Sequence, residues 1–234
     1  MDRERQLFCF TCAGGRAALF DDIERELPML RVEKLEYAGH GTRHREPVYA
    51  DFSALAEDMF SRIKAAYAGG HYGLFGYSMG SIAVLEVLRR ISASGFTRPR
   101  HVFLAAHEPF VKKELLGFSE TESDEWVKQR TIRFGAVPDR LMDNRSFWRV
   151  YLPLYRADYD LVCKYRFEDI RYETDIPVTI FYSEEDTPSA HMAQWRRFFV
   201  GPFALCSFSG THFFIQEHFR EMAAMIRDRL GGDK

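Results

Sequence analysis

The pentapeptide Gly76-Tyr77-Ser78-Met79-Gly80 fits the pattern G-x-S-x-G, which places a serine on a sharp turn between a strand and a helix. The apolar run Tyr72–Phe75 precedes the motif, and apolar residues at helical spacing follow it from 82 to 91. Glycines on either side remove side chains that would clash in such a turn. The helix start adds backbone N–H groups where negative charge develops during attack on a carbonyl. The pattern predicts that Ser78 is a nucleophile.

An acid should follow, because hydrolases with this motif carry serine, acid and histidine in that chain order. Functional groups in such folds lie beyond the carboxyl ends of strands. Asp186 follows the strongly β-prone run Val178–Tyr182, whereas Asp175 precedes this run and would lie at the wrong end. We expect Asp186 to be the acid, and its neighbours Glu184 and Glu185 stay open as alternatives.

Three histidines follow the acid. His212 lies in a loop directly after the predicted strand Phe203–Phe208, whereas His218 lies within a predicted helix and His191 starts a surface helix. We expect His212 to be the general base, which takes the proton of the serine. The acid would fix the tautomer of the histidine and stabilise its imidazolium form.

The tetrahedral intermediate of such a reaction needs two N–H donors for its oxyanion. One should be the backbone N–H of Met79, the residue after the serine, and the other should come from a loop after an early strand. The segment Cys12-Ala13-Gly14-Gly15 provides such a loop, and we expect Ala13 to be the second donor. We expect Cys12 and Tyr77 to contact the substrate, with Cys12 lining the pocket rather than acting as a nucleophile.

The elements that position these residues alternate between short apolar runs and helical patterns, which predicts βα units and a largely parallel sheet flanked by helices. Together with the serine motif, this order predicts the α/β-hydrolase fold. Asp51 is expected to cap the helix that begins at Phe52. Strands are predicted at 7–10, 32–37, 72–75, 102–106, 178–182 and 203–208, and helices at 52–63, 82–91, 190–199 and 217–230.

Between Pro109 and Asp175 the pattern changes, because no strand is apparent and helical patterns carry many aromatic residues. We interpret residues 1–234 as a single domain with a helical insertion at about 110–175 rather than as two domains.

The composition is that of an ordinary globular protein, with 46% hydrophobic residues and a net charge of −2. Nucleic-acid binders usually show a clustered basic excess, so no nucleic-acid partner is expected. The chain starts without a signal-peptide pattern and has no run of the ~20 apolar residues that span a bilayer. We expect a cytoplasmic monomer with no membrane partner. The four cysteines lack metal-type spacing, so we expect free thiols and no metal.

Several segments together resemble the type II thioesterases of polyketide and non-ribosomal peptide pathways. They cover the chain from about Leu7 to Leu230, and the combination is more specific than the serine motif alone. The matching segments are Phe10-Thr11-Cys12-Ala13-Gly14-Gly15, the serine motif, Leu152-Pro153 with Arg156-Ala157-Asp158-Tyr159, Asp186 with Trp195, and Gly210-Thr211-His212-Phe213-Phe214.

The chain departs from the family's pattern at four places. Thr11 replaces a proline, Tyr77 replaces a histidine, and Ser183 replaces a glycine ahead of the acid. Ala38-Gly39-His40 replaces a P-G-R segment. No departure touches the serine, acid or histidine, but the changes at Tyr77 and Ala38 bear on substrate preference.

The resemblance implies that the substrate is an acyl or aminoacyl thioester on the phosphopantetheine arm of an acyl or peptidyl carrier protein, and that the enzyme needs no cofactor of its own. Its role would be editing, the removal of stalled or wrong acyl groups. The insertion would then be a mobile lid, whose aromatic face covers the acyl chain and excludes water. Attraction of an acidic carrier would need a basic cluster, for which Arg130, Arg133 and Arg140, or Arg43 and Arg45, are candidates.

Three other functions stay open. A carboxylesterase or lipase would use the same three residues. An acyltransferase would pass the acyl group to an alcohol or amine instead of water. A non-catalytic binding protein on this scaffold would not need the intact set of serine, acid and histidine.

Overall fold

A parallel sheet of six strands forms the centre of the computed structural model, which describes residues 5–110 and 123–231. The strand order is β2-β1-β3-β4-β5-β6, and every neighbouring pair is parallel. The predicted α/β architecture is therefore confirmed. The strands are β1 (Gln6–Phe10), β2 (Arg31–Leu35), β3 (Tyr72–Tyr77), β4 (His101–Ala105), β5 (Val178–Ser183) and β6 (Phe203–Phe208).

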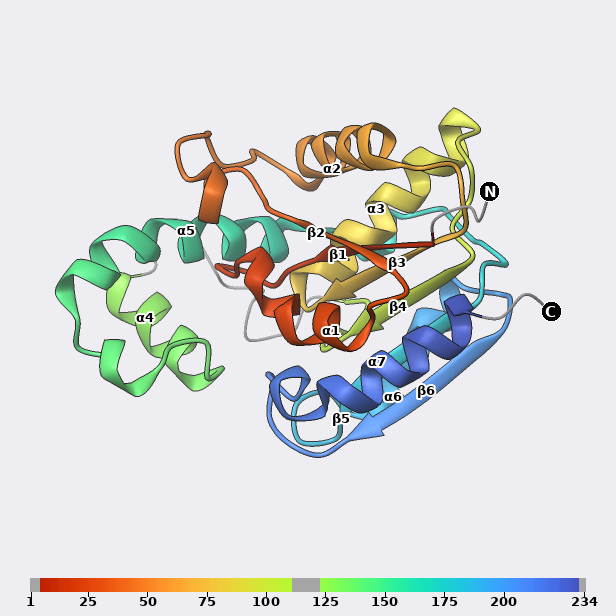
Figure 1. Cartoon of the computed structure of the whole chain (residues 1–234). Coiled ribbons are helices and arrows are strands. Elements are labelled where there is room, and N and C mark those ends of the chain that lie inside the picture. Colours follow the sequence, from red (N-terminus) through yellow and green to blue (C-terminus); the bar gives the residue numbers. More distant parts are fainter. Residues whose placement is uncertain (1–4, 111–122, 232–234) are drawn as a thin grey trace.

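Helices cover both faces of this sheet (Figure 1). On one face α2 (Phe52–Ala66) packs beside α3 (Met79–Ser94), and on the other α1 (Asp21–Glu26) packs beside α7 (Ile215–Gly231). Strands β1, β3, β4 and β5 are buried along their whole length. Burial on both faces explains why these strands read as continuous apolar runs rather than as alternating ones.

The helix α2 shows how local sequence sets an element. Its large apolar residues recur on one side and are buried in the main core. The side chain of Asp51 accepts a hydrogen bond from the Ala54 N–H at 2.7 Å, which satisfies one of the amides left free at the helix start. The predicted cap is thus confirmed.

Several predicted boundaries differ from the structure. α3 begins at Met79 rather than at residue 82, because the turn at Ser78 passes directly into the helix. The predicted helix 190–199 is instead a short α6 (Ser189–Met192) followed by a 3₁₀ helix, Ala193–Arg197. β2 ends at Leu35 and α7 begins at Ile215.

The predicted helical insertion contains α4 (Asp124–Arg133) and α5 (Arg145–Lys164), and its residues 111–122 lie outside the described residues. In Figure 1, α4 and the outer part of α5 project beyond the sheet. They share a small apolar cluster of their own, whereas the inner end of α5 joins the main core. The small cluster is built on Val127, Val137, Trp148, Tyr155 and Tyr159.

Pro153 lies inside α5, between these two ends. A proline within a helix lacks the N–H that bonds one turn back, and its ring crowds the preceding turn. The helix therefore lacks one backbone hydrogen bond near its middle. That this segment is an insertion in a single domain stays a prediction, as does its function as a lid. No helix of the described residues is long and apolar enough to cross a membrane.

We predict a gradient of amide hydrogen exchange along α5. Amides of α4 and of the part of α5 before Pro153 should exchange faster than those of β3 and β4, because these segments pack mainly through the small cluster, with Trp126 also against the main core. Amides near Leu161 and Val162 should be as slow as the main core, to which both residues belong. Hydrogen exchange followed by mass spectrometry checks this, and uniformly slow exchange through α4 and α5 would contradict a mobile lid.

Candidate active site

Ser78 occupies a backbone conformation that L-residues rarely adopt, with φ of 54° and ψ of −119°. Such a residue stores strain on the order of 1–3 kcal/mol and persists only where its surroundings enforce it. A Cβ on Gly76 would lie 2.3 Å from the carbonyl oxygen of Gly80, and one on Gly80 would lie 2.1 Å from that of Phe10. The two motif glycines are thus required because β3, α3 and β1 approach each other closely here.

Hydrogen bonds hold this turn against the neighbouring strand. The Ser78 N–H donates to the carbonyl oxygen of Ala105, the last residue of β4, at 2.8 Å. The hydroxyl of Ser81, one turn into α3, lies 3.1 Å from the carbonyl oxygens of both Gly76 and Ala105. The strained turn is therefore fixed to the carboxyl end of the sheet.

A chain of hydrogen bonds joins Ser78, His212 and Asp186. Nε2 of His212 lies 3.0 Å from the Ser78 Oγ, and its Nδ1 lies 3.0 Å from both carboxylate oxygens of Asp186. A carboxylate only accepts hydrogen bonds, so Nδ1 carries the hydrogen and Nε2 offers its lone pair to the serine O–H. This tautomer suits a base that removes the serine proton.

The structure places the other acids away from the histidine ring. Glu184 accepts from the Ser189 N–H, and Glu185 from the Gly210 N–H. Asp175 forms an ion pair with Arg98 before β5, at the opposite end of that strand. Asp186 is nearly buried, with a side chain 6% exposed, and it receives a hydrogen bond from the Thr187 hydroxyl at 3.0 Å.

The loop that carries His212 is held by two side chains. The hydroxyl of Tyr77 donates to the carbonyl oxygen of His212 at 2.6 Å, and that of Ser183 donates to the carbonyl oxygen of Gly210. Tyr77 is fully buried and does not line the cavity beside Ser78, so the structure does not support the predicted contact of Tyr77 with substrate. Tyr77 instead supports the loop that holds the histidine.

The other two histidines lie elsewhere. His218 is within α7, and its Nε2 lies 3.1 Å from the hydroxyl of Ser209. His191 is exposed in α6.

Ala13 and Met79, the two predicted oxyanion donors, line the same cavity as Ser78. Met79 is the first residue of α3, and the first N–H groups of a helix have no hydrogen-bond acceptor within that helix. In the loop after β1, the Gly14 N–H donates to Asp158 and the Gly15 N–H to the Cys12 carbonyl. Among the hydrogen bonds given for residues 5–110 and 123–231, the Ala13 N–H is not a donor. Its role in the oxyanion hole stays a prediction.

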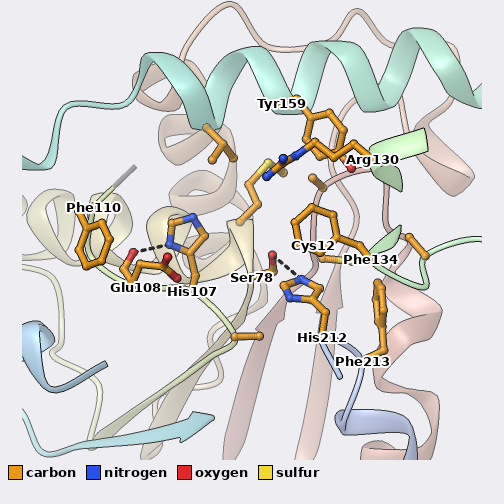
Figure 2. Close-up of a pocket in the computed structure, with 15 residues that line it drawn as sticks. Cys12, Ser78, His107, Glu108, Phe110, Arg130, Phe134, Tyr159, His212 and Phe213 are labelled. Atoms are coloured by element: carbon orange, nitrogen blue, oxygen red, sulfur yellow. Dashed lines mark hydrogen bonds between the residues drawn. The ribbon is translucent and has the colours of Figure 1, made fainter. Parts of the chain in front are cut away.

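The cavity beside Ser78 and His212 is mostly apolar but carries three further polar side chains (Figure 2). His107 and Glu108 directly follow the end of β4, and Arg130 comes from α4. The sequence did not single out His107 and Glu108, although the rule that located Asp186 also applies to them. Arg130 was expected in a basic docking cluster, but it lines the cavity. The apolar lining consists of Cys12, Ala13, Met79, Ala106, Phe110, Phe134, Ala136, Tyr159, Val162 and Phe213.

Cys12 lines this cavity, but its chemistry differs from that of a nucleophile. Burial raises the pKa of the Cys12 thiol to about 11, so the thiolate is scarce near neutral pH. Its predicted contact with substrate stays a prediction. All four cysteines are free thiols, as expected. In the part of the chain that the structure describes, no group of three or more His, Cys, Asp or Glu side chains could hold a metal ion.

The helix α4 reaches the base directly. The ring of Phe134, at the end of α4, lies 4.9 Å from the ring of His212, measured between centroids. The guanidinium of Arg130 in turn lies over the Phe134 ring, with its carbon 5.0 Å from the ring centroid. The predicted lid therefore covers the histidine in this structure.

The parallel sheet with a serine on a tight turn at its carboxyl edge defines the α/β-hydrolase fold. The model of the thioesterase domain family matches residues 5–230. The chain belongs to the thioesterase family and is therefore a hydrolase that acts on thioesters.

Individual relatives agree with this assignment. The chain is 26% identical to "Thioesterase PikA5" from Streptomyces venezuelae, over 96% of this chain and 80% of that protein. It is similar to the structure of the RedJ thioesterase from the prodiginine pathway of Streptomyces coelicolor, with 25% identity, a TM-score of 0.85, and coverage of 97% and 85% of the two chains. ClbQ from the colibactin pathway shares the fold, with 23% identity, a TM-score of 0.88 and coverage of 97% of both chains. The resemblance to type II thioesterases is thus confirmed.

We predict that Ser78→Ala abolishes turnover without unfolding the protein. Loss of the nucleophile should lower kcat by ~10³-fold or more, which leaves the residual rate that binding and the oxyanion hole provide. The matched control is Ser92→Ala, which removes an exposed hydroxyl from the same helix. Steady-state kinetics and thermal unfolding of both variants check this, and near wild-type turnover in folded Ser78→Ala would exclude a serine mechanism.

We predict that His212→Ala and His218→Ala differ sharply. His212→Ala should reduce kcat to the level of Ser78→Ala, because residues that act as a unit give similar losses. His218→Ala removes contacts with Ser209, Glu221 and the ring of Phe208, none of which is a catalytic residue, and should keep kcat within about twofold of wild type. Comparable catalytic losses in both histidine variants would mean that the base is misassigned.

Proposed function

We propose that this chain hydrolyses acyl or aminoacyl thioesters on the phosphopantetheine arm of a carrier protein, with Ser78, His212 and Asp186 as the catalytic residues. The observation that carries the proposal is the continuous hydrogen-bond chain from Ser78 to Asp186 beside a mostly apolar cavity. Membership of the thioesterase family indicates that the bond that is broken is the C–S bond of a thioester.

In the first step the Oγ of Ser78 attacks the thioester carbonyl carbon while Nε2 of His212 takes the hydroxyl proton. The resulting imidazolium is paired with Asp186, whose carboxylate already faces Nδ1. The carbonyl oxygen becomes an oxyanion that accepts hydrogen bonds from the Met79 and Ala13 N–H groups. When this intermediate collapses, the C–S bond breaks, the sulfur takes the proton from His212, and Ser78 remains acylated.

The second step repeats this geometry with water. His212 removes a proton from water, which attacks the acyl carbonyl carbon and forms a second oxyanion at the same two N–H groups. Collapse breaks the bond to the Ser78 Oγ, which regains a proton from His212. The products are a carboxylic acid and the free thiol of the carrier arm, so all atoms of the added water are accounted for.

The carrier-protein substrate rests on the relatives rather than on the cavity. PikA5 is named a thioesterase, and RedJ is a thioesterase of a biosynthetic pathway. By analogy, we propose that the role is editing, the release of stalled acyl groups from carrier domains. The apolar lining from α4 and α5 suits an acyl chain that must be shielded from water.

The exposure and pairing of the candidate arginines decide which of them could attract an acidic carrier. Arg43, one of the candidates in the sequence, has a side chain only 10% exposed and is paired with Glu46 and Asp58. It is therefore a structural residue rather than a docking one. Arg45, Arg133 and Arg140 are exposed and remain candidates, of which Arg133 lies on α4 of the predicted lid.

We predict that kcat/KM is higher for an acyl group on a carrier protein than for the same group on a pantetheine mimic. The chemistry at Ser78 is identical for both, so the advantage must come from remote contacts that bind and orient the thioester. Arg133→Ala combined with Arg140→Ala should reduce this preference at low ionic strength, and Arg227→Ala on α7 is the matched control.

Two comparisons separate the alternatives. A matched oxygen ester that is hydrolysed as fast as the thioester would indicate a general esterase, and acylated alcohols or amines detected by mass spectrometry would indicate an acyltransferase. Equal kcat/KM for carrier-bound and free pantetheine thioesters would remove the carrier protein from the proposal and leave a general thioesterase.

A further inference from the structure

Asp158 of α5 forms a buried junction between three separate segments of the chain. Its Oδ2 accepts the Gly14 N–H at 2.6 Å and also lies 2.9 Å from Nε2 of His40. The side chains of His40 and Asp158 are 1% and 3% exposed. A single carboxylate oxygen therefore links the helix α5 to the loop after β1 and to the loop after β2.

The contacts of His40 define the charge of this junction. Nδ1 of His40 lies 3.0 Å from the carbonyl oxygen of Ala38, and its Nε2 faces the Asp158 carboxylate. Both partners are acceptors when Asp158 is ionised, and this arrangement fits an imidazole that carries hydrogens on both nitrogens and is therefore a cation. Hydrogen bonds between charged groups are stronger than neutral ones, and a buried ion pair fixes its partners in one arrangement.

The same helix also packs directly on Gly14. This residue has φ of +64°, and a Cβ there would lie 1.9 Å from a ring carbon of Tyr155, one turn before Asp158. The loop thus fits α5 only because residue 14 has no side chain. Position and hydrogen bonding of the loop both depend on where α5 lies.

Gly14 directly follows Ala13, the proposed oxyanion donor, and the peptide that Asp158 holds adjoins the one that carries the Ala13 N–H. We propose that Asp158 is a positioning residue, through which α5 sets the orientation of the Ala13 N–H toward the reacting carbonyl. This inference rests on the proposed function, because it presumes that Ala13 stabilises an oxyanion. Seating of α5 on the loop then completes the oxyanion hole.

The test is Asp158→Asn, with Asp160→Asn as the matched control. Asparagine has the shape of aspartate but no charge, so it weakens the bonds to both His40 and Gly14. Asp160 lies on the same helix and pairs only with Lys164 among the contacts given for it in the described residues. Complete loss of one oxyanion donor costs ~10²–10³ in kcat, so a misaligned donor should cost about 10- to 100-fold, with KM nearly unchanged.

A second readout reports on the oxyanion hole itself. A trifluoromethyl ketone forms a tetrahedral oxyanion adduct with an active serine, and its affinity should fall in Asp158→Asn by the same factor as kcat. A merely structural loss would instead lower thermal stability or the fraction of active protein. If folded Asp158→Asn keeps kcat and inhibitor affinity within about twofold of wild type, as expected for Asp160→Asn, the inference is overturned.

The pH profile of wild-type kcat offers a second measurement. The hydrogen bond and charge of Asp158 raise the pKa of His40 above its usual value, against the effect of burial, and Glu36 adds to the increase. A raised pKa means that the ion pair is present below that pKa and is lost as pH rises through it. We therefore expect kcat to decline as pH rises through the midpoint of His40.

The buried thiol and phenols around the junction have raised pKa values. Burial raises the pKa of Cys12 to about 11 and that of Tyr159 to about 12, and it raises the pKa of Tyr37 and Tyr155 further. The NMR signal of the His40 ring, assigned by its loss in His40→Gln, gives the midpoint directly. A kcat that stays constant while this signal titrates would overturn the inference.

Failure of this inference and failure of the proposed function give different results. If wild-type protein hydrolyses neither a pantetheine thioester nor an activated oxygen ester, the proposed function fails. If wild-type protein is active and Asp158→Asn is equally active, only the role of Asp158 fails.

Discussion

The strained backbone at Ser78 is the constraint on which the site depends. A positive φ at a serine is costly, and here it is enforced by the contact of two glycines with backbone oxygens and by bonds to the end of β4. This turn can exist only at the carboxyl edge of a parallel sheet, where a strand passes directly into a helix. The loops after β1, β5 and β6 begin at the same edge of the sheet, so the position of the turn also determines which of their residues can contact the serine.

This dependence explains how much the sequence predicted. The glycines around Ser78, the cap at Asp51 and the position of Asp186 after a strand are local signals, and the structure has each in its expected place. The contacts that hold the site are not local. Tyr77 meets the His212 backbone across 135 residues, and Gly14 meets Asp158 across 144. No periodicity or short motif encodes such pairs, because they follow from packing of the completed fold.

Three positions where the chain departs from the type II thioesterase pattern occupy this supporting layer. The hydroxyls of Tyr77 and Ser183 each donate to a carbonyl of the histidine loop, and His40 holds the carboxylate of Asp158. None of them provides the nucleophile, acid or base. These departures therefore lie in bonds that support the catalytic groups, whereas the sequence alone had linked only Tyr77 and Ala38 to substrate preference.

The two helices beside the cavity contact both halves of the proposed machinery. Phe134 at the end of α4 packs on the ring of His212, while Asp158 and Tyr155 of α5 contact the loop that carries Ala13. In our proposal, an acyl chain bound beneath these helices would affect the base and the oxyanion donor together. Binding energy from the remote acyl chain can then be used to seat the helices and align the catalytic groups. Selectivity among acyl groups would arise in this coupling, in kcat as well as in KM, rather than in the serine, histidine and aspartate themselves.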